Sequence, residues 1–138
     1  MKHPVIGFIS SSPPSDRKAS SGTAYTIAQQ LKGMGTLYWI PAPRSRYYRI
    51  MELVAKAFSR LFRKNISFGN TILGAKTLAS GIKSDLFDKC DILVAFFTGS
   101  KLGYVDLKGK PLIYLSDATF SAMINYYPPF CKLWRWKI

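Results

Sequence analysis

Two short polar segments carry side chains able to bind a polar ligand, and each follows an apolar run. The first segment is residues 20–25, after the run 5–9, and the second is residues 116–120, after the run 112–115. Each run predicts a strand, fully buried in the case of 5–9, and the polar residues after it predict the start of a helix. In an open α/β sheet, ligands bind outside the carboxyl ends of the strands. A binding site is therefore expected at these junctions.

The first junction offers two hydroxyl groups and a glycine at a predicted helix start. Ser21 is expected to cap a helix over residues 22–32, and Thr23 lies in its first turn. Free backbone N–H groups and the positive end of the helix dipole favour an anionic or polar ligand. Gly22 allows a ligand to approach the backbone closely. A simple capping role for Ser21 explains the same residues, and both interpretations stay open.

Two further loops are predicted at the same edge of the sheet. Thr98, Gly99 and Ser100 follow the apolar run 92–96 and form a third candidate binding loop. In the second junction, Ser116 precedes Asp117. The Asp117 carboxylate either caps the following helix, worth about 1 kcal/mol, or binds a substrate hydroxyl and assists proton transfer. The two roles can coexist.

The charge of the chain predicts an anionic partner. The chain has twenty Lys and Arg residues and seven Asp and Glu residues, for a formal net charge of +13. A predicted helix over residues 45–64 joins basic residues to an apolar side, which is typical of a segment on an anionic membrane. The alternative, which we favour for the apolar side, is a surface helix whose apolar side packs on the sheet while its basic side is solvated. The basic residues assigned to an anionic surface, a lipid membrane or a phosphorylated lipid or sugar acceptor, are Arg44, Arg46, Arg49, Lys56, Arg60, Arg63 and Lys64.

Several function classes lack the residues they need. His3 is the only histidine, so a Ser-His-Asp arrangement around any other histidine is excluded. Two cysteines without metal-type spacing predict no metal site, and specific nucleic-acid binding would rest on charge alone. No apolar run reaches membrane-spanning length, and no secretory signal is recognised. The expected location is cytoplasmic, peripheral on the inner face of the membrane.

The pattern of elements predicts an α/β fold. Strands at 5–9, 36–40, 92–96 and 112–115 alternate with helices at 22–32, 45–64, 71–89 and from 117 onward. This alternation is typical of a Rossmann-like, three-layer, doubly wound domain with a mostly parallel sheet. One domain over residues 1–130 is expected, with an aromatic and basic tail at 131–138. An unpaired sheet edge predicts self-association.

The two junctions resemble the N-terminal half of family 4 glycosyltransferases, which have the GT-B fold. A bacterial subgroup carries Trp-Ser-Gly-Thr-Pro-Tyr after the first strand, and residues 20–25 here are Ser-Ser-Gly-Thr-Ala-Tyr. The subgroup also carries Tyr-x-Ser-Asp-Ala-Thr-Phe, which residues 114–120 match. The resemblance extends to about Phe130.

This resemblance implies a role in retaining transfer of a sugar from a nucleotide-sugar donor. The family holds the donor mainly through a second domain that this chain does not match, so the chain would be an acceptor-side fragment or truncated homologue, inactive alone and without a cofactor of its own. The implied acceptor-binding residues include Tyr25 and Ser116, and Asp117 is the candidate catalytic group. Many family members have a His-Asp pair where Ser116 and Asp117 stand here, so a catalytic-base role is not carried over to Ser116.

Overall fold

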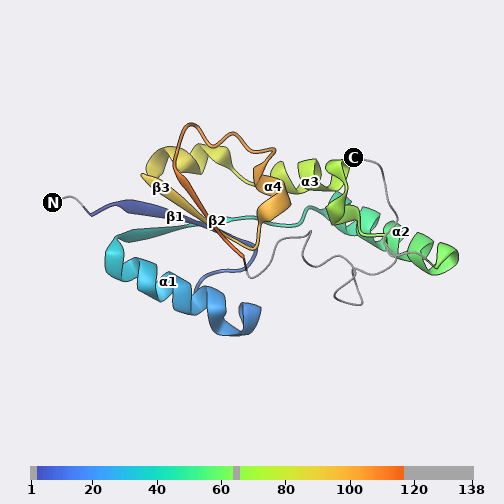
Figure 1. Ribbon diagram of the computed structural model, residues 1–138, viewed down its shortest axis with the longest axis horizontal. Coiled ribbons are helices and arrows are strands. Elements are labelled where there is room, and N and C mark those ends of the chain that lie inside the picture. The colour runs from blue at the N-terminus through green and yellow to red at the C-terminus, as the bar shows by residue number, and fades with distance from the viewer. Residues whose placement is uncertain (1–2, 64–65, 117–138) are drawn as a thin grey trace.

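The computed structural model describes residues 3–63 and 66–116, and its centre is a parallel four-stranded sheet (Figure 1). The strands lie in the order β2-β1-β3-β4. Helices cover both faces of the sheet. The predicted Rossmann-like α/β architecture is confirmed, and the strands are β1 (Val5–Ser10), β2 (Thr36–Pro41), β3 (Ile92–Phe96) and β4 (Leu112–Leu115).

Four α-helices and three short 3₁₀ segments connect the strands within the described residues. Helix α1 follows β1, α2 and α3 lie between β2 and β3, and α4 follows β3. The helices are α1 (Thr23–Met34), α2 (Arg46–Phe62), α3 (Ile72–Ala79) and α4 (Gly99–Leu102), and the 3₁₀ segments are Ala19–Gly22, Phe68–Asn70 and Ser84–Lys89.

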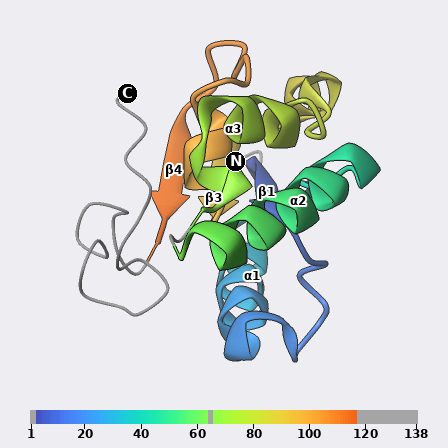
Figure 2. The same cartoon turned by 90° about the vertical axis from the view of Figure 1, so that its right-hand side faces the viewer.

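Each face of the sheet buries its own apolar cluster, because side chains alternate along each strand. Phe8 and Val94 point to the face that α1 covers. Ile9 and Leu93 point to the opposite face, where the 3₁₀ segment Ser84–Lys89 adds the fully buried Phe87. Helices α1 and α3 accordingly lie on opposite sides of the sheet in both views (Figures 1 and 2).

The amino edge of the sheet is closed by tight backbone contacts. The Asp91 side chain accepts a hydrogen bond from Val5 N–H at 2.8 Å, and Asp91 N–H donates to Val5 O at 2.8 Å. Gly35 ends α1 beside Pro4, whose carbonyl would collide with a β-carbon at position 35. A glycine is therefore needed at position 35 for close approach.

The helix predicted over residues 71–89 is wrong in its length. Helix α3 ends at Ala79, a turn follows, and residues 84–89 form a 3₁₀ segment. The turn brings the backbone at Gly81 against Pro43, where a β-carbon would lie 3.0 Å from Pro43 O. Gly81 directly follows the C-cap residue Ser80, and a glycine there both disfavours a continuing helix and allows this close approach.

Other predictions fall outside the described residues. These include the helix from Asp117, the tail at 131–138 and the role of Lys64. Among the residues that are described, no helix has the length and apolar character needed to cross a membrane.

Candidate functional site

The carboxyl edge of the sheet has the topology of a ligand site between β1 and β3. From β1 the chain passes to β2 on one side, and β3 and β4 lie on the other side of β1. The loops after β1 and β3 therefore diverge at this point, and such a switch point is where open α/β sheets bind ligands. The polar residues brought there decide what can bind.

Lys101 is the most unusual side chain at this edge. It lies in α4 directly after β3, and only 8% of its surface is exposed. Its Nζ donates to Ser11 Oγ, in the loop after β1, at 3.4 Å. The neighbouring Leu102 packs into the apolar cluster of Ile9 and Ile40, which holds α4 against the edge of the sheet. The β1 and β3 loops thus meet at the Lys101 ammonium group.

The Lys101 charge has no carboxylate partner among residues 3–63 and 66–116. The ion pairs found there are Arg44 with Glu52 at 3.8 Å and Lys108 with Asp88 at 2.5 Å. Burial, and then the positive charge of Arg44, lower the pKa of Lys101. Both effects disfavour the charged ammonium form, so a nearby anion would stabilise it.

Thr98 adds a second unusual polar group to the β3 loop. It is 1% exposed, and its Oγ1 has no hydrogen-bond partner among the described residues. The preceding residue, Phe97, has a φ of 51°, in the left-handed region that a bulky residue rarely adopts. Buried hydroxyls are normally hydrogen-bonded, so an unpartnered one next to a strained residue indicates a functional loop.

The first junction forms a left-handed turn instead of the predicted N-cap. Ser20, Ser21 and Gly22 all have positive φ values of 51°, 54° and 81°. Gly22 is the N-cap of α1, and no side chain makes a capping hydrogen bond there. The Ser21 cap was therefore a wrong prediction: the left-handed turn moves the helix start to Thr23. Ser21 and Thr23 are exposed at this end of α1.

The other predicted site residues are placed as follows. The Tyr25 hydroxyl accepts a hydrogen bond from Arg17 Nη2 at 3.1 Å, and the Arg17 guanidinium lies 4.9 Å from the Tyr25 ring centre. Gly99 and Ser100 form the start of α4, and Ser116 is exposed just after β4. The predicted loops after β1, β3 and β4 thus share the carboxyl edge. Asp117 lies outside the described residues.

Helix α2 divides into three faces along its length. Ser45 caps it, with its Oγ accepting from Tyr48 N–H at 3.1 Å. The packed face is narrow: Tyr48 and Ala55 are buried, and Tyr48 contacts the Phe68 ring at 5.5 Å between centres. At helical spacing, two exposed faces lie side by side. The apolar face of α2 consists of Tyr47, Ile50, Val54, Phe58 and Leu61, and the basic face of α2 consists of Arg46, Arg49, Lys56 and Arg60.

The alternative in which the apolar side of α2 packs on the sheet is wrong. Helix α2 packs against the 3₁₀ segment at Phe68 and against α3, and it projects past the carboxyl edge of the sheet (Figure 1). The apolar clusters at the two sheet faces contain no residue of α2. The exposed apolar side chains therefore call for a functional explanation.

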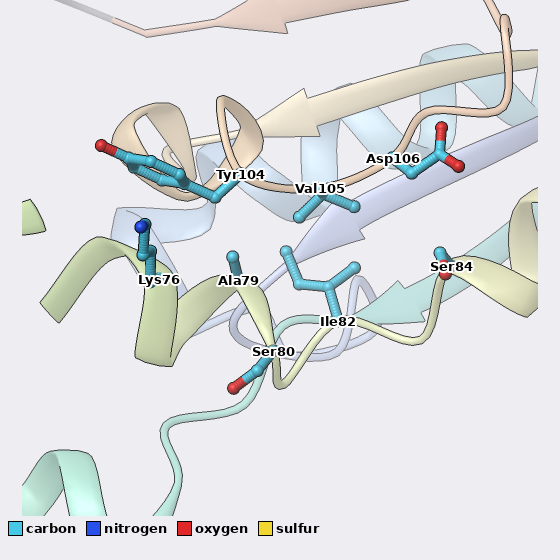
Figure 3. Close-up of a pocket in the computed structure, with 8 residues that line it drawn as sticks. All are labelled: Lys76, Ala79, Ser80, Ile82, Ser84, Tyr104, Val105 and Asp106. Atoms are coloured by element: carbon cyan, nitrogen blue, oxygen red, sulfur yellow. The ribbon is translucent and has the colours of Figure 1, made fainter. Parts of the chain in front are cut away.

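A separate pocket of about 360 Å³ lies between α3 and the chain after α4 (Figure 3). Ala79, Ile82 and Val105 give it an apolar lining, and the Lys76 ammonium lies 5.6 Å from the Tyr104 ring centre. The one lysine there already has an aromatic partner. We therefore place the candidate site at the carboxyl edge, where the Lys101 charge has no carboxylate partner within the described part of the chain.

Sequence reasoning missed Lys101 and Ser11. Lys101 directly follows the predicted loop at residues 98–100, and a lysine in such a loop is normally solvated. The sequence signal for a buried position was the next residue, Leu102, whose apolar side chain packs in the core and so places α4 against the sheet. No group of three potential metal ligands occurs within the described residues.

No protein-family model, curated protein or solved structure matches the chain.

Proposed function

We propose that this chain is the acceptor-side domain of a glycosyltransferase of the GT-B type, which binds an acceptor but does not transfer sugar alone. The observation that carries the proposal is the meeting of the β1 and β3 loops at a switch point, with the Ser20–Gly22 turn on the same edge. The resemblance of residues 20–25 and 114–120 to family 4 glycosyltransferases supports the reaction class. The donor-binding half has no counterpart in the residues that carry this resemblance.

The test of this function has a catalytic and a binding part. We expect no transfer when the chain alone is incubated with nucleotide sugars, and turnover would contradict the acceptor-side assignment. A phosphorylated sugar should bind in calorimetry, and Thr23→Val should weaken binding because it removes a hydroxyl at the start of α1. Thr36→Val is the matched control, since Thr36 is exposed at the opposite edge of the sheet. Absence of any binding, or equal effects of both variants, would reject the proposal.

A second candidate function is binding to an anionic membrane surface, with or without a catalytic role. The observation that favours it is the pair of adjacent exposed faces on α2, one apolar and one basic. A helix lying in the membrane interface buries apolar side chains at the acyl boundary, while lysine and arginine side chains contact anionic headgroups. Zwitterionic lipid would satisfy the apolar face alone, so the basic face selects anionic lipid.

Charge reversal tests this second function. Arg60→Glu with Arg63→Glu should strongly reduce co-sedimentation with phosphatidylglycerol vesicles, since each basic residue near such a surface contributes about 1 kcal/mol. Lys32→Glu with Lys83→Glu changes the net charge equally at exposed positions outside α2. Equal loss in both variants would show that net charge alone drives binding, and no loss in either would exclude α2 as the contact.

A further inference from the structure

We propose that Lys101, together with Ser11 and Arg44, forms a binding site for a phosphoryl group at the carboxyl edge of the sheet. This inference rests on the proposed function in one respect, because it names the chemical group by which a phosphorylated acceptor would be held. The site itself follows from the residues and does not require that sugar transfer takes place.

The three residues come from the loops after three different strands. Ser11 follows β1, Arg44 follows β2, and Lys101 follows β3. The Lys101 Nζ lies 3.4 Å from Ser11 Oγ, and Arg44 adds positive charge at the same edge, which together with burial lowers the pKa of Lys101. Parallel strands bring these loops to one edge although Ser11 and Lys101 are 90 residues apart in the chain.

The charges at this site favour an anion with more than one negative charge. Lys101 is more than nine-tenths buried and has no carboxylate partner among the described residues. Glu52 offsets part of the Arg44 charge at 3.8 Å, and within residues 3–63 and 66–116 no such pair offsets Lys101. Two cations that repel each other are both stabilised by one dianion, and a phosphate monoester supplies that charge with several acceptor oxygens.

The hydroxyl groups support the same ligand. Ser11 is exposed, so the residue whose hydroxyl contacts the Lys101 ammonium group faces solvent. Ser10 Oγ is already engaged with Ser12 O at 2.7 Å and Trp39 Nε1 at 3.1 Å, which leaves Ser11 as the β1-loop hydroxyl next to Lys101. The unpartnered Thr98 Oγ1 lies in the same loop as Lys101.

Inorganic phosphate is the probe for this site, titrated at constant ionic strength against chloride while protein melting is followed. Phosphate should stabilise the folded chain saturably, because a ligand of the native state raises its stability. Lys101→Met should raise the dissociation constant for phosphate at least about tenfold, since a charge-assisted hydrogen bond is lost. Its melting temperature without phosphate should equal or exceed that of the wild type, because a buried charge is removed. The control Lys32→Met should bind phosphate like the wild type.

A second variant keeps the test decisive if Lys101→Met folds poorly. Ser11→Asp places a carboxylate beside Lys101, so the chain should melt at a higher temperature and lose its response to phosphate. No saturable effect of phosphate on the wild type, or a response unchanged in both Lys101→Met and Ser11→Asp, would overturn the proposal.

Two arms distinguish the sources of the phosphoryl group. Glycerol 3-phosphate tests a soluble ligand, and phosphatidic acid vesicles test a lipid headgroup. Dependence on Lys101 in either arm supports the site and identifies its ligand, and dependence in neither arm rejects it. If vesicle binding is lost in the Arg60 and Arg63 variant but kept in Lys101→Met, the vesicles bind through α2 and not through the Lys101 site. The two variants therefore test membrane binding by α2 and phosphoryl binding at Lys101 separately.

Discussion

The apolar face of α2 makes a quantitative prediction about membrane insertion. Ile50 and Leu61 are 51% and 75% exposed, so replacing both by serine removes apolar surface that already faces solvent. Full burial of such a side chain contributes about 1.5–3 kcal/mol. Scaled by the exposed fractions, the pair contributes about 2–4 kcal/mol when both side chains insert, which is about 30- to 700-fold in partitioning.

The assay is co-sedimentation with phosphatidylglycerol vesicles at low and high salt. Salt screens the contribution of the basic face but not that of the apolar face, so the Ile50→Ser, Leu61→Ser variant should keep its defect at high salt. Its thermal stability should change by less than about 0.5 kcal/mol per site, because both side chains are exposed in the folded chain.

A matched control removes an exposed apolar side chain elsewhere. Met34 is 67% exposed at the end of α1, near the amino edge of the sheet, so Met34→Ser should leave vesicle binding unchanged. Unchanged partitioning of the α2 double variant would refute insertion of this face. An equal loss of vesicle binding in the Met34 variant would refute the assignment of the membrane contact to α2.

Three further outcomes test the fold and the site. Gly74→Ala should lower the free energy of unfolding in urea by about 1–3 kcal/mol, because the added β-carbon collides with the backbone carbonyl of Phe68; no change would contradict this packing. Ser21→Gly should raise it by up to about 1–2 kcal/mol by relieving the left-handed conformation, and a loss of stability would argue against the turn. The lowered pKa of Lys101 means that the unfolded chain binds more protons between the folded and unfolded pKa values, so Lys101 destabilises the fold below this interval and stability rises as pH increases through it. Stability curves measured against pH should lose this rise in Lys101→Met, and identical curves would contradict the burial of a charged Lys101.

The parts of the fold that were predictable depend on local patterns. Strands β1 and β3 are continuous apolar runs because both faces of the sheet are covered there. All four strands were located from the sequence, although β4, at the sheet edge, leaves Ile113 and Tyr114 half exposed. The start of α2 was also local, since Ser45 caps the helix through its own side chain. The contact of Gly81 with the Pro43 backbone, just after the end of α3, could not be predicted locally, because Pro43 belongs to the loop after β2.

The candidate site was predictable by position but not by residue. The loops after parallel strands lie at one edge of the sheet, and the hydroxyl-bearing and glycine residues in these loops indicated a binding site there. Two facts depend on tertiary contacts instead: the burial of Lys101 through Leu102, and the left-handed turn at Ser20 and Ser21. The exposure of the apolar face of α2 is also a tertiary outcome, because Ile82, the 3₁₀ segment Ser84–Lys89 and Leu102 of α4 cover the face of the sheet opposite α1, while α2 packs against Phe68 and Leu78.

The closed amino edge has a consequence for how this chain can change over evolutionary time. The mutual hydrogen bonds of Val5 and Asp91 and the contact of Gly35 with Pro4 join β1, β2 and β3 at the end farthest from the candidate ligand. Substitutions in the loops at the carboxyl edge leave these junctions intact, so ligand preference can diverge without rebuilding the sheet. A deep mutational scan for folded protein should accordingly show intolerance at Asp91 and Gly35 and tolerance at Ser11.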